Sequence, residues 1–224
     1  MGHHGNQFLS FGAVAAEFAS LYESFQDLTV LQKQHFIEWF SGKALDLLWR
    51  KFQHTGVTTF SMVDGIDGGF QMDTDSAGVG YIDFDDGTTL FRQYKHDASI
   101  AIFVCKTGGV TGAGHEIGLA GRRGDNALDA MFYSNVESQS FTRLRTGDAS
   151  TSTFTNSSVT RHDNFTTIKL EASTIDIKMT EDGVLEVTKT TNRPTAKMSP
   201  KFRNLGGSAA NGISSIRYLE AFNT

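Results

Sequence analysis

From residue 57 to residue 224 the chain is a succession of short segments in which apolar and polar residues alternate. In the clearest one, 174–180, Ile175, Ile177 and Met179 are expected to face a core and the residues between them to face water. Successive side chains of a β-strand point to opposite faces, so this pattern indicates a half-buried antiparallel strand. Only 2 prolines interrupt the 224 residues. The pattern therefore predicts an all-β domain.

Turn signals separate the expected strands, and the strongest is Glu181-Asp182-Gly183, which predicts a tight hairpin. The expected strands are 57–63, 68–73, 78–84, 90–96, 98–105, 115–120, 127–134, 138–145, 150–155, 164–172, 174–180, 184–190, 200–205 and 213–222. Many short strands at regular spacing are typical of a sandwich or jelly roll. The segment 98–105 is apolar at nearly every position, which predicts a central strand covered on both faces.

The first 40 residues show helical spacing instead. Two short helices are expected, the second starting at a capping box formed by Thr29 and Gln32. Such helices cannot bury their apolar faces alone. Packing onto the chain's own β domain and packing against a second copy or another protein stay open alternatives. The expected oligomerisation or docking residues are Phe18, Leu21, Phe25, Leu31, Phe36 and Phe40.

Charge and hydropathy exclude some partners. The net charge of −5 lacks the basic excess of a duplex-binding protein, so nucleic acid is not an expected partner. No apolar stretch approaches the roughly 20 residues that span a bilayer, and no secretory signal is visible. We therefore expect that the protein is made in a cytoplasm and that it does not insert into a membrane. The single cysteine, Cys105, is expected to be a small buried apolar residue.

Several phrases together resemble a known family. Residues 39–49 contain Phe-Ser-Gly, then Leu-Asp and a Trp, and Asp67-Gly68-Gly69-Phe70 resembles a second strand. The segments 183–187 and 213–222 are similar to the closing strands. This order resembles concanavalin A-like lectin/glucanase domains of the laminin-G-like type. The resemblance implies an antiparallel jelly roll over residues 41–224, with residues 1–40 as a helical arm.

Glucanases of this family carry Glu-x-Asp-x-Glu on one strand, where two carboxylates about 5 Å apart act as nucleophile and acid/base. The nearest approach here runs from Glu181 through Asp182 to Glu186, in the wrong order and across a turn. We therefore expect a non-enzymatic protein without catalytic residues. A diverged glycoside hydrolase acting through Glu181 or Glu186 remains an alternative.

Acidic residues gather in the expected loops between residues 64 and 86. Lectin-like jelly rolls often hold calcium in such loops, because hard cations require several oxygen ligands. The candidate ligands are Asp83, Asp85 and Asp86. Solvated turn carboxylates are the preferred interpretation, so no cofactor is expected, with calcium as the alternative.

A jelly roll with a short helical leader is also similar to structural proteins of phages and other viruses, such as capsid decoration proteins and head fibres. That resemblance predicts a protein of the virion surface that forms a homo-oligomer, with a trimer favoured. The same resemblance implies docking on a capsid or other virion protein, and contact with glycans, as expectations. A free carbohydrate-binding lectin, calcium-dependent or not, is the main alternative.

Overall fold

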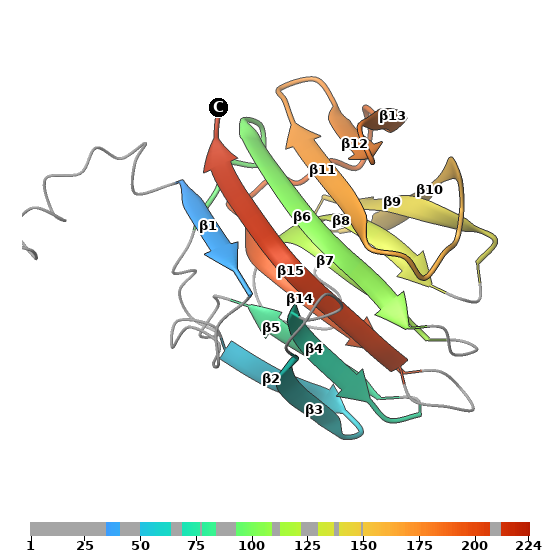
Figure 1. Cartoon of the computed structure of the whole chain (residues 1–224). Coiled ribbons are helices and arrows are strands. Elements are labelled where there is room, and N and C mark those ends of the chain that lie inside the picture. The colour runs from blue at the N-terminus through green and yellow to red at the C-terminus, as the bar shows by residue number, and fades with distance from the viewer. Residues whose placement is uncertain are drawn as a thin grey trace, which may run out of the picture. The chain divides into compact units, whose positions relative to one another are not determined.

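A computed structural model describes most of the unit Gln34–Thr224. The described residues are 35–40, 50–63, 69–76, 78–83, 93–108, 113–121, 130–136, 139–148, 150–206 and 212–224. They form two antiparallel sheets (Figure 1). Within these ranges no helix occurs, and thus no helix that is long and apolar enough to cross a membrane. The expected all-β sandwich is confirmed.

Each sheet brings together strands that are distant in the sequence. The eight-stranded sheet has the order β13 (Val184–Lys189), β12 (Ile177–Glu181), β11 (Thr166–Ala172), β6 (Ser99–Gly108), β15 (Gly212–Asn223), β4 (Gly69–Thr74) and β3 (Thr58–Val63), and β1 (Phe36–Trp39) pairs with β15. The seven-stranded sheet has the order β10 (Ser152–Thr160), β9 (Phe141–Gly147), β8 (Ala130–Val136), β7 (Gly114–Ala120), β14 (Ser199–Leu205), β5 (Val79–Asp83) and β2 (Arg50–Thr55). The last strand, β15, lies beside β6 in the middle of its sheet.

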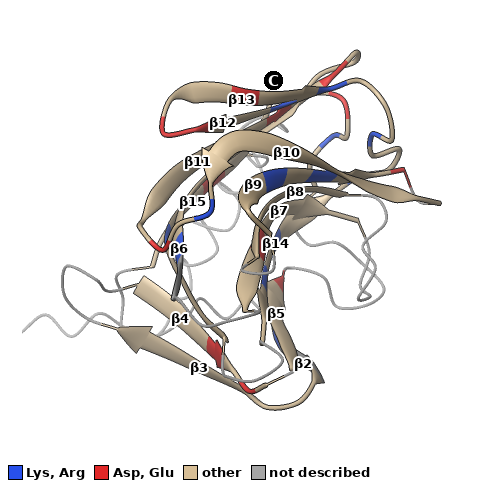
Figure 2. Ribbon diagram, turned by 90° about the vertical axis from the view of Figure 1, so that its right-hand side faces the viewer, with Lys and Arg blue, Asp and Glu red and all other residues tan. Residues whose placement is uncertain are grey.

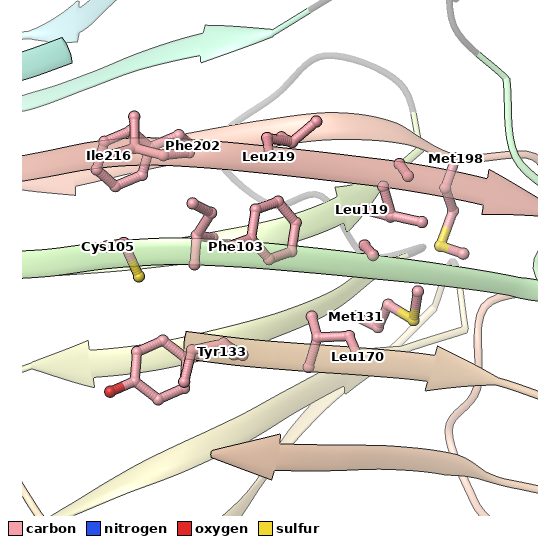
Figure 3. Close-up of a cluster of buried hydrophobic side chains, with 14 of the residues drawn as sticks. Phe103, Cys105, Leu119, Met131, Tyr133, Leu170, Met198, Phe202, Ile216 and Leu219 are labelled. Carbon is pink, nitrogen blue, oxygen red and sulfur yellow. The ribbon is translucent and has the colours of Figure 1, made fainter. Parts of the chain in front are cut away.

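The core fills the space between the two sheets. Every second residue of a strand points into it, as Phe103 of β6, Leu119 of β7 and Met131 of β8 do (Figure 3). Each of these side chains is fully buried. Burying one large apolar side chain stabilises the folded state by roughly 1.5–3 kcal/mol. The alternation seen in the sequence thus becomes one continuous apolar layer.

The hairpin between β12 and β13 confirms the turn expected at Asp182-Gly183. Asp182 and Gly183 have φ angles of 47° and 85°, the left-handed conformation that a tight two-residue hairpin turn requires. Ile177 and Met179 are buried as expected, but Ile175 is 72% exposed. The strand begins only at Ile177, because the preceding residues form a turn in which Ser173 accepts hydrogen bonds from the backbone.

β6 differs from the expectation of a strand covered on both faces. Ala101, Phe103 and Cys105 are buried, but the alternating residues between them are only half-buried. The strand is central within its sheet, between β11 and β15. The described chain covers its outer face only in part.

The expectation of a second helix is wrong for its C-terminal end. Residues 36–39 form β1, whose register with β15 pairs Phe36 with Ala221. Phe36 and Phe40 point into the core, whereas Trp39 is 67% exposed. Neither phenylalanine is therefore available as an exposed docking residue. Pairing with β15 overrides the weak helical preference of this segment. Phe18, Leu21, Phe25 and Leu31 lie outside the described residues.

Candidate functional site

Charged and aromatic side chains gather on the face of the seven-stranded sheet that points away from the core. The strand registers align them in two neighbouring rows across the sheet. One row is Phe154, Arg145, Phe132, Gly118, Lys201 and Asp83, and the other is Asn156, Arg143, Ser134, Glu116, Arg203 and Tyr81. We call these residues the arginine face. Basic residues mark β9 within it, as the blue band in Figure 2 shows.

Glu116 occupies the centre of the arginine face. Its Oε2 atom accepts hydrogen bonds from Nη1 of Arg145 at 2.7 Å and from Nη1 of Arg203 at 2.9 Å. Glu116 is 3% exposed and Arg145 6%. The three side chains come from β7, β9 and β14, so one buried carboxylate joins three strands. A buried charge without a partner is costly, so removing Glu116 would destabilise the fold by leaving both arginines without their counter-ion.

A second ion pair lies further along the sheet. Nζ of Lys201 is 3.6 Å from Oδ2 of Asp83, and both side chains are buried. The Lys201 ammonium also lies 5.2 Å from the centre of the Tyr81 ring, a distance at which a cation is attracted to the ring face. Asp83 is thus placed on a sheet face beside a cation.

Phe154 supplies the aromatic surface at the edge of the arginine face. It belongs to the edge strand β10 and is 45% exposed. The Arg143 guanidinium lies 4.2 Å from the centre of its ring and that of Arg145 lies 5.6 Å away. Arginine stacks well on aromatic faces. This edge is therefore where the arginine face meets solvent.

The arginine face holds more hydrogen-bond donors than acceptors. Nε of Arg143, of Arg145 and of Arg203 has no hydrogen-bond partner, and neither has Oγ of Ser134. Burial lowers the pKa of Arg143, the Glu116 carboxylate opposes that shift, and the like charge of Arg145 adds to it. Arginine remains a cation in proteins. The arrangement can therefore receive a ligand that presents acceptor oxygens.

A different polar cluster lies inside the sandwich and holds Glu181. This residue is 3% exposed. It accepts hydrogen bonds from the hydroxyls of Tyr133 and Thr142, at 3.2 and 2.8 Å, and Nε2 of His162 lies 3.0 Å from Oε1. Glu186 instead binds Ser158 on the surface. The two glutamates named as alternative catalytic residues are thus not brought together.

Cys105 and His115 lie beside this cluster, with Sγ 3.6 Å from Nε2. Burial raises the pKa of the Cys105 thiol, and Glu181 and Asp182 add to the increase. Burial lowers the pKa of His115 to about 3. A neutral thiol beside a neutral imidazole is not a nucleophile. The expectation that Cys105 is a buried apolar residue is confirmed.

An open hollow of about 380 Å³ lies at the loop end of the sandwich. Its lining is His96, Asp97, Asp148, Thr174, Arg193, Pro194 and Thr195. Oδ1 of Asp148 accepts four hydrogen bonds from Ser150 and Thr151, which lower the pKa of Asp148 to about 2. Arg193 donates to the carbonyl of Ser173. These groups already hold the loops together, so the hollow is a weaker candidate than the arginine face.

The calcium prediction stays a prediction. Asp83 is buried at the end of β5 and paired with Lys201, so the interpretation as a solvated turn carboxylate is wrong for this residue. Asp85 and Asp86 lie outside the described residues. Within the described part of the chain, no three His, Cys, Asp or Glu side chains are grouped closely enough to hold a metal ion.

Sequence reasoning missed Glu116, Arg145 and Arg203. Arg145 lies 29 positions after Glu116, and Arg203 lies 87 positions after it. Only the strand order brings the three residues together. The available signal was alternation within β7 and β9, which assigns Glu116, Arg143 and Arg145 to polar faces. That signal cannot say which strands are neighbours.

No known protein family matches the sequence, and no curated protein matches it. Solved structures, however, match the fold over most of the chain. The apo Crh5 transglycosylase is 17% identical, with 87% of this chain and 86% of that chain covered and a TM-score of 0.61. A prokaryotic β-1,3-1,4-glucanase (lichenase) derived from a mouse hindgut metagenome is 11% identical, with 85% and 100% covered and a TM-score of 0.62.

The carbohydrate recognition domain of Emp47p is a third similar structure. It is 12% identical, with 85% of this chain and 95% of that chain covered and a TM-score of 0.58. At these identities the likeness establishes the fold. The chain is a concanavalin-like jelly roll, the fold of carbohydrate-binding and carbohydrate-cleaving domains, as the sequence resemblance implied.

The comparisons correct the expectation that the protein is not an enzyme. Transglycosylases and glucanases are prominent among the similar structures. That expectation depended on the missing Glu-x-Asp-x-Glu order, and the described strands indeed lack it. A catalytic arrangement built across strands has no such signature, so its absence does not exclude catalysis.

Proposed function

We propose that this jelly roll binds a glycan on its arginine face. The observation that carries the proposal is the pair of cross-strand rows, in which three arginines, a buried glutamate and an exposed phenylalanine meet on one sheet face. Glycan sites need hydrogen-bonding groups beside an apolar surface on which a sugar ring can stack. The fold, shared with a carbohydrate recognition domain and with glucanases, supports the same function.

The direct test is a glycan array probed with the full chain and with Phe154→Ala. We expect retention of at least one glycan class, and weaker retention by the variant because it loses the exposed ring. The matched control is Ile175→Ala, which removes an exposed apolar side chain from a turn before β12. If no glycan is retained, or if both variants bind like the original chain, the proposal fails.

Glycan cleavage or transfer is a second candidate, favoured by the transglycosylase and glucanases among the similar structures. The arginine face offers two described carboxylates, Glu116 and Asp83. One strand lies between them and their register differs by two residues, so their Cα atoms are roughly 12 Å apart by sheet geometry. Hydrolysis of a glycosidic bond commonly uses two carboxylates on opposite sides of that bond.

Product analysis after incubation with mixed-linkage β-glucan and with chitin oligosaccharides tests this candidate. We expect new oligosaccharides from the original chain and none from Glu116→Gln or Asp83→Asn. Each variant is first shown to be folded by its unfolding curve. Equal product formation by both variants would exclude these carboxylates from the reaction.

The N-terminal apolar residues and the viral resemblance still motivate a place on a virion surface, self-association as a trimer and docking on a capsid protein. We retain these as proposals. Their residues Phe18, Leu21, Phe25 and Leu31 lie outside the described part of the chain, and the mass of the protein in solution tests them.

A further inference from the structure

The charge of the arginine face is opposite to that of the whole chain. The described face carries four cations, Arg143, Arg145, Arg203 and Lys201, against two carboxylates, Glu116 and Asp83. The difference is an excess of two positive charges. The sequence as a whole has a net charge of −5, so negative charge elsewhere in the chain outweighs the positive excess of this face.

The ion pairs do not use up the donors of this face. Arg145 and Arg203 each reach Glu116 through Nη1, and the Nε atoms of both, like Nε of Arg143, have no hydrogen-bond partner. Ser134, which the register places between Arg143 and Glu116, has a hydroxyl without a partner as well. Buried donors normally find acceptors, and the described protein atoms do not provide them here.

Access is best at the edge of the sheet. Arg143 is only half-buried, and it stacks on Phe154, which is 45% exposed. A ligand that arrives at β10 meets the phenylalanine ring and the Arg143 guanidinium first, and then the buried Arg145 and the half-buried Arg203. An arginine fork matches the geometry of a carboxylate or a sulfate.

We propose that the glycan recognised by the arginine face is anionic, with carboxylate or sulfate groups that accept hydrogen bonds from Arg143 and its neighbours. This inference rests on the proposed glycan binding and names the ligand class. A neutral glycan brings hydroxyl donors as well as acceptors and leaves the two excess positive charges unmatched. The charged groups of an anionic glycan accept hydrogen bonds without donating any, and two of them balance both positive charges.

The test compares charged and neutral oligosaccharides of similar length by calorimetric titration of the full chain. The probes are hexamers of galacturonate for carboxylates, chondroitin sulfate hexamers for sulfates together with carboxylates, and cellohexaose and laminarihexaose as neutral glycans. We expect at least one acidic hexamer to bind roughly tenfold more tightly or better than both neutral ones. Its binding should weaken as sodium chloride rises from 50 to 500 mM.

The variant that isolates the site is Arg143→Gln, with Lys169→Gln as its matched control. Lys169 is a half-exposed residue of β11 in the other sheet, paired with Glu171, and its loss changes the net charge equally. We expect Arg143→Gln to weaken the binding of the acidic hexamer roughly 10- to 100-fold. Arg143→Lys should give an intermediate loss, because it keeps the charge without the fork, and Lys169→Gln should give none.

The outcomes separate this inference from the proposed function. If a neutral hexamer binds as tightly as the acidic ones and Arg143→Gln weakens both alike, glycan binding at the arginine face stands and the anionic preference is overturned. If Arg143→Gln weakens neither, the glycan binds elsewhere, and the proposed function and this inference both fail. If no hexamer binds, the proposed function fails with it. If a single-stranded oligonucleotide of equal charge competes as well as the acidic hexamer, the face is a general polyanion site, and the inference is overturned too.

Discussion

At the scale of single residues, burial decides what the ionisable groups inside the sandwich can do. Cys105 and His115 lie 3.6 Å apart, an arrangement that would suggest a thiolate–imidazolium pair if it were exposed. Here burial moves both groups toward their neutral forms. Proximity alone is therefore a poor guide to reactivity in this core.

The first prediction concerns the Cys105 thiol. In the folded protein it should react with an aromatic disulfide reagent roughly a hundredfold more slowly, or slower still, than in urea, because its raised pKa and burial suppress the thiolate. Absorbance at neutral pH follows the reaction. Equal rates in buffer and in urea would mean that Cys105 is accessible and the packing around β6 is wrong.

The second prediction concerns His115 and pH. The native pKa is about 3, whereas the unfolded chain binds the proton near pH 6.5. Between these values the unfolded state holds more protons, so stability falls as pH falls. His115 should account for a loss of about 2 kcal/mol in the free energy of unfolding between pH 7 and pH 5.

Urea unfolding of the original chain and of His115→Asn at both pH values measures this contribution. The variant is expected to be less stable at pH 7 but to lose less stability on acidification. His162, which lies beside Glu181, and the other histidines are common to both proteins and cancel in the comparison. The same pH dependence in both proteins would contradict the assignment.

At the scale of the elements, Glu116 ties β7 to β9 and β14. Glu116→Gln should lower the free energy of unfolding by about 3–5 kcal/mol, because it leaves two largely buried guanidinium groups without their counter-ion. The control Glu171→Gln breaks the half-exposed pair with Lys169 and should cost about 0–1 kcal/mol. Similar losses for the two variants in urea would show that the Glu116 ion pairs are not buried.

β1 gives the next prediction. A chain that starts at Gly42 lacks β1. Residues 218–221 of β15 then lose their paired strand, and the core loses the buried rings of Phe36 and Phe40. Loss of one buried phenylalanine ring costs about 3–5 kcal/mol. We therefore expect a much lower melting temperature than for a chain that starts at Gln34. Equal melting temperatures would mean that β1 does not contribute to the sandwich.

The elements also show what the sequence can reveal. Period-two patterning and turn residues located most of the described strands, including the β12–β13 hairpin at Asp182-Gly183. The patterning failed at β1, where four residues are too few to distinguish strand from helix and pairing with β15 decides. It also missed β2, which precedes the first expected strand, and it predicted a strand over 90–96 where the described residues 93–96 form an isolated bridge at Tyr94. The ion pairs of Glu116 require the strand order, which depends on contacts between distant segments.

At the scale of the whole molecule, the sandwich provides two outer surfaces with different character. The eight-stranded sheet exposes Trp39, next to Tyr218, together with Ile37. The seven-stranded sheet carries the arginine face.

Light scattering of the chain from Gln34 and of the full chain separates self-association by the N-terminal residues from self-association by the sandwich. A trimer that becomes a monomer on truncation supports the proposed arm.

The central claim is that a glycan binds at the arginine face, and the Nε–H resonances of arginine in a nitrogen-15 spectrum test it most directly. Titration with the tightest-binding oligosaccharide from the array should shift the Nε–H signal of Arg143, which Arg143→Gln identifies by its disappearance. The signal of Arg193, at the loop hollow, should stay in place. A shift of Arg193 with none at Arg143 would move the glycan site to the hollow and contradict the account.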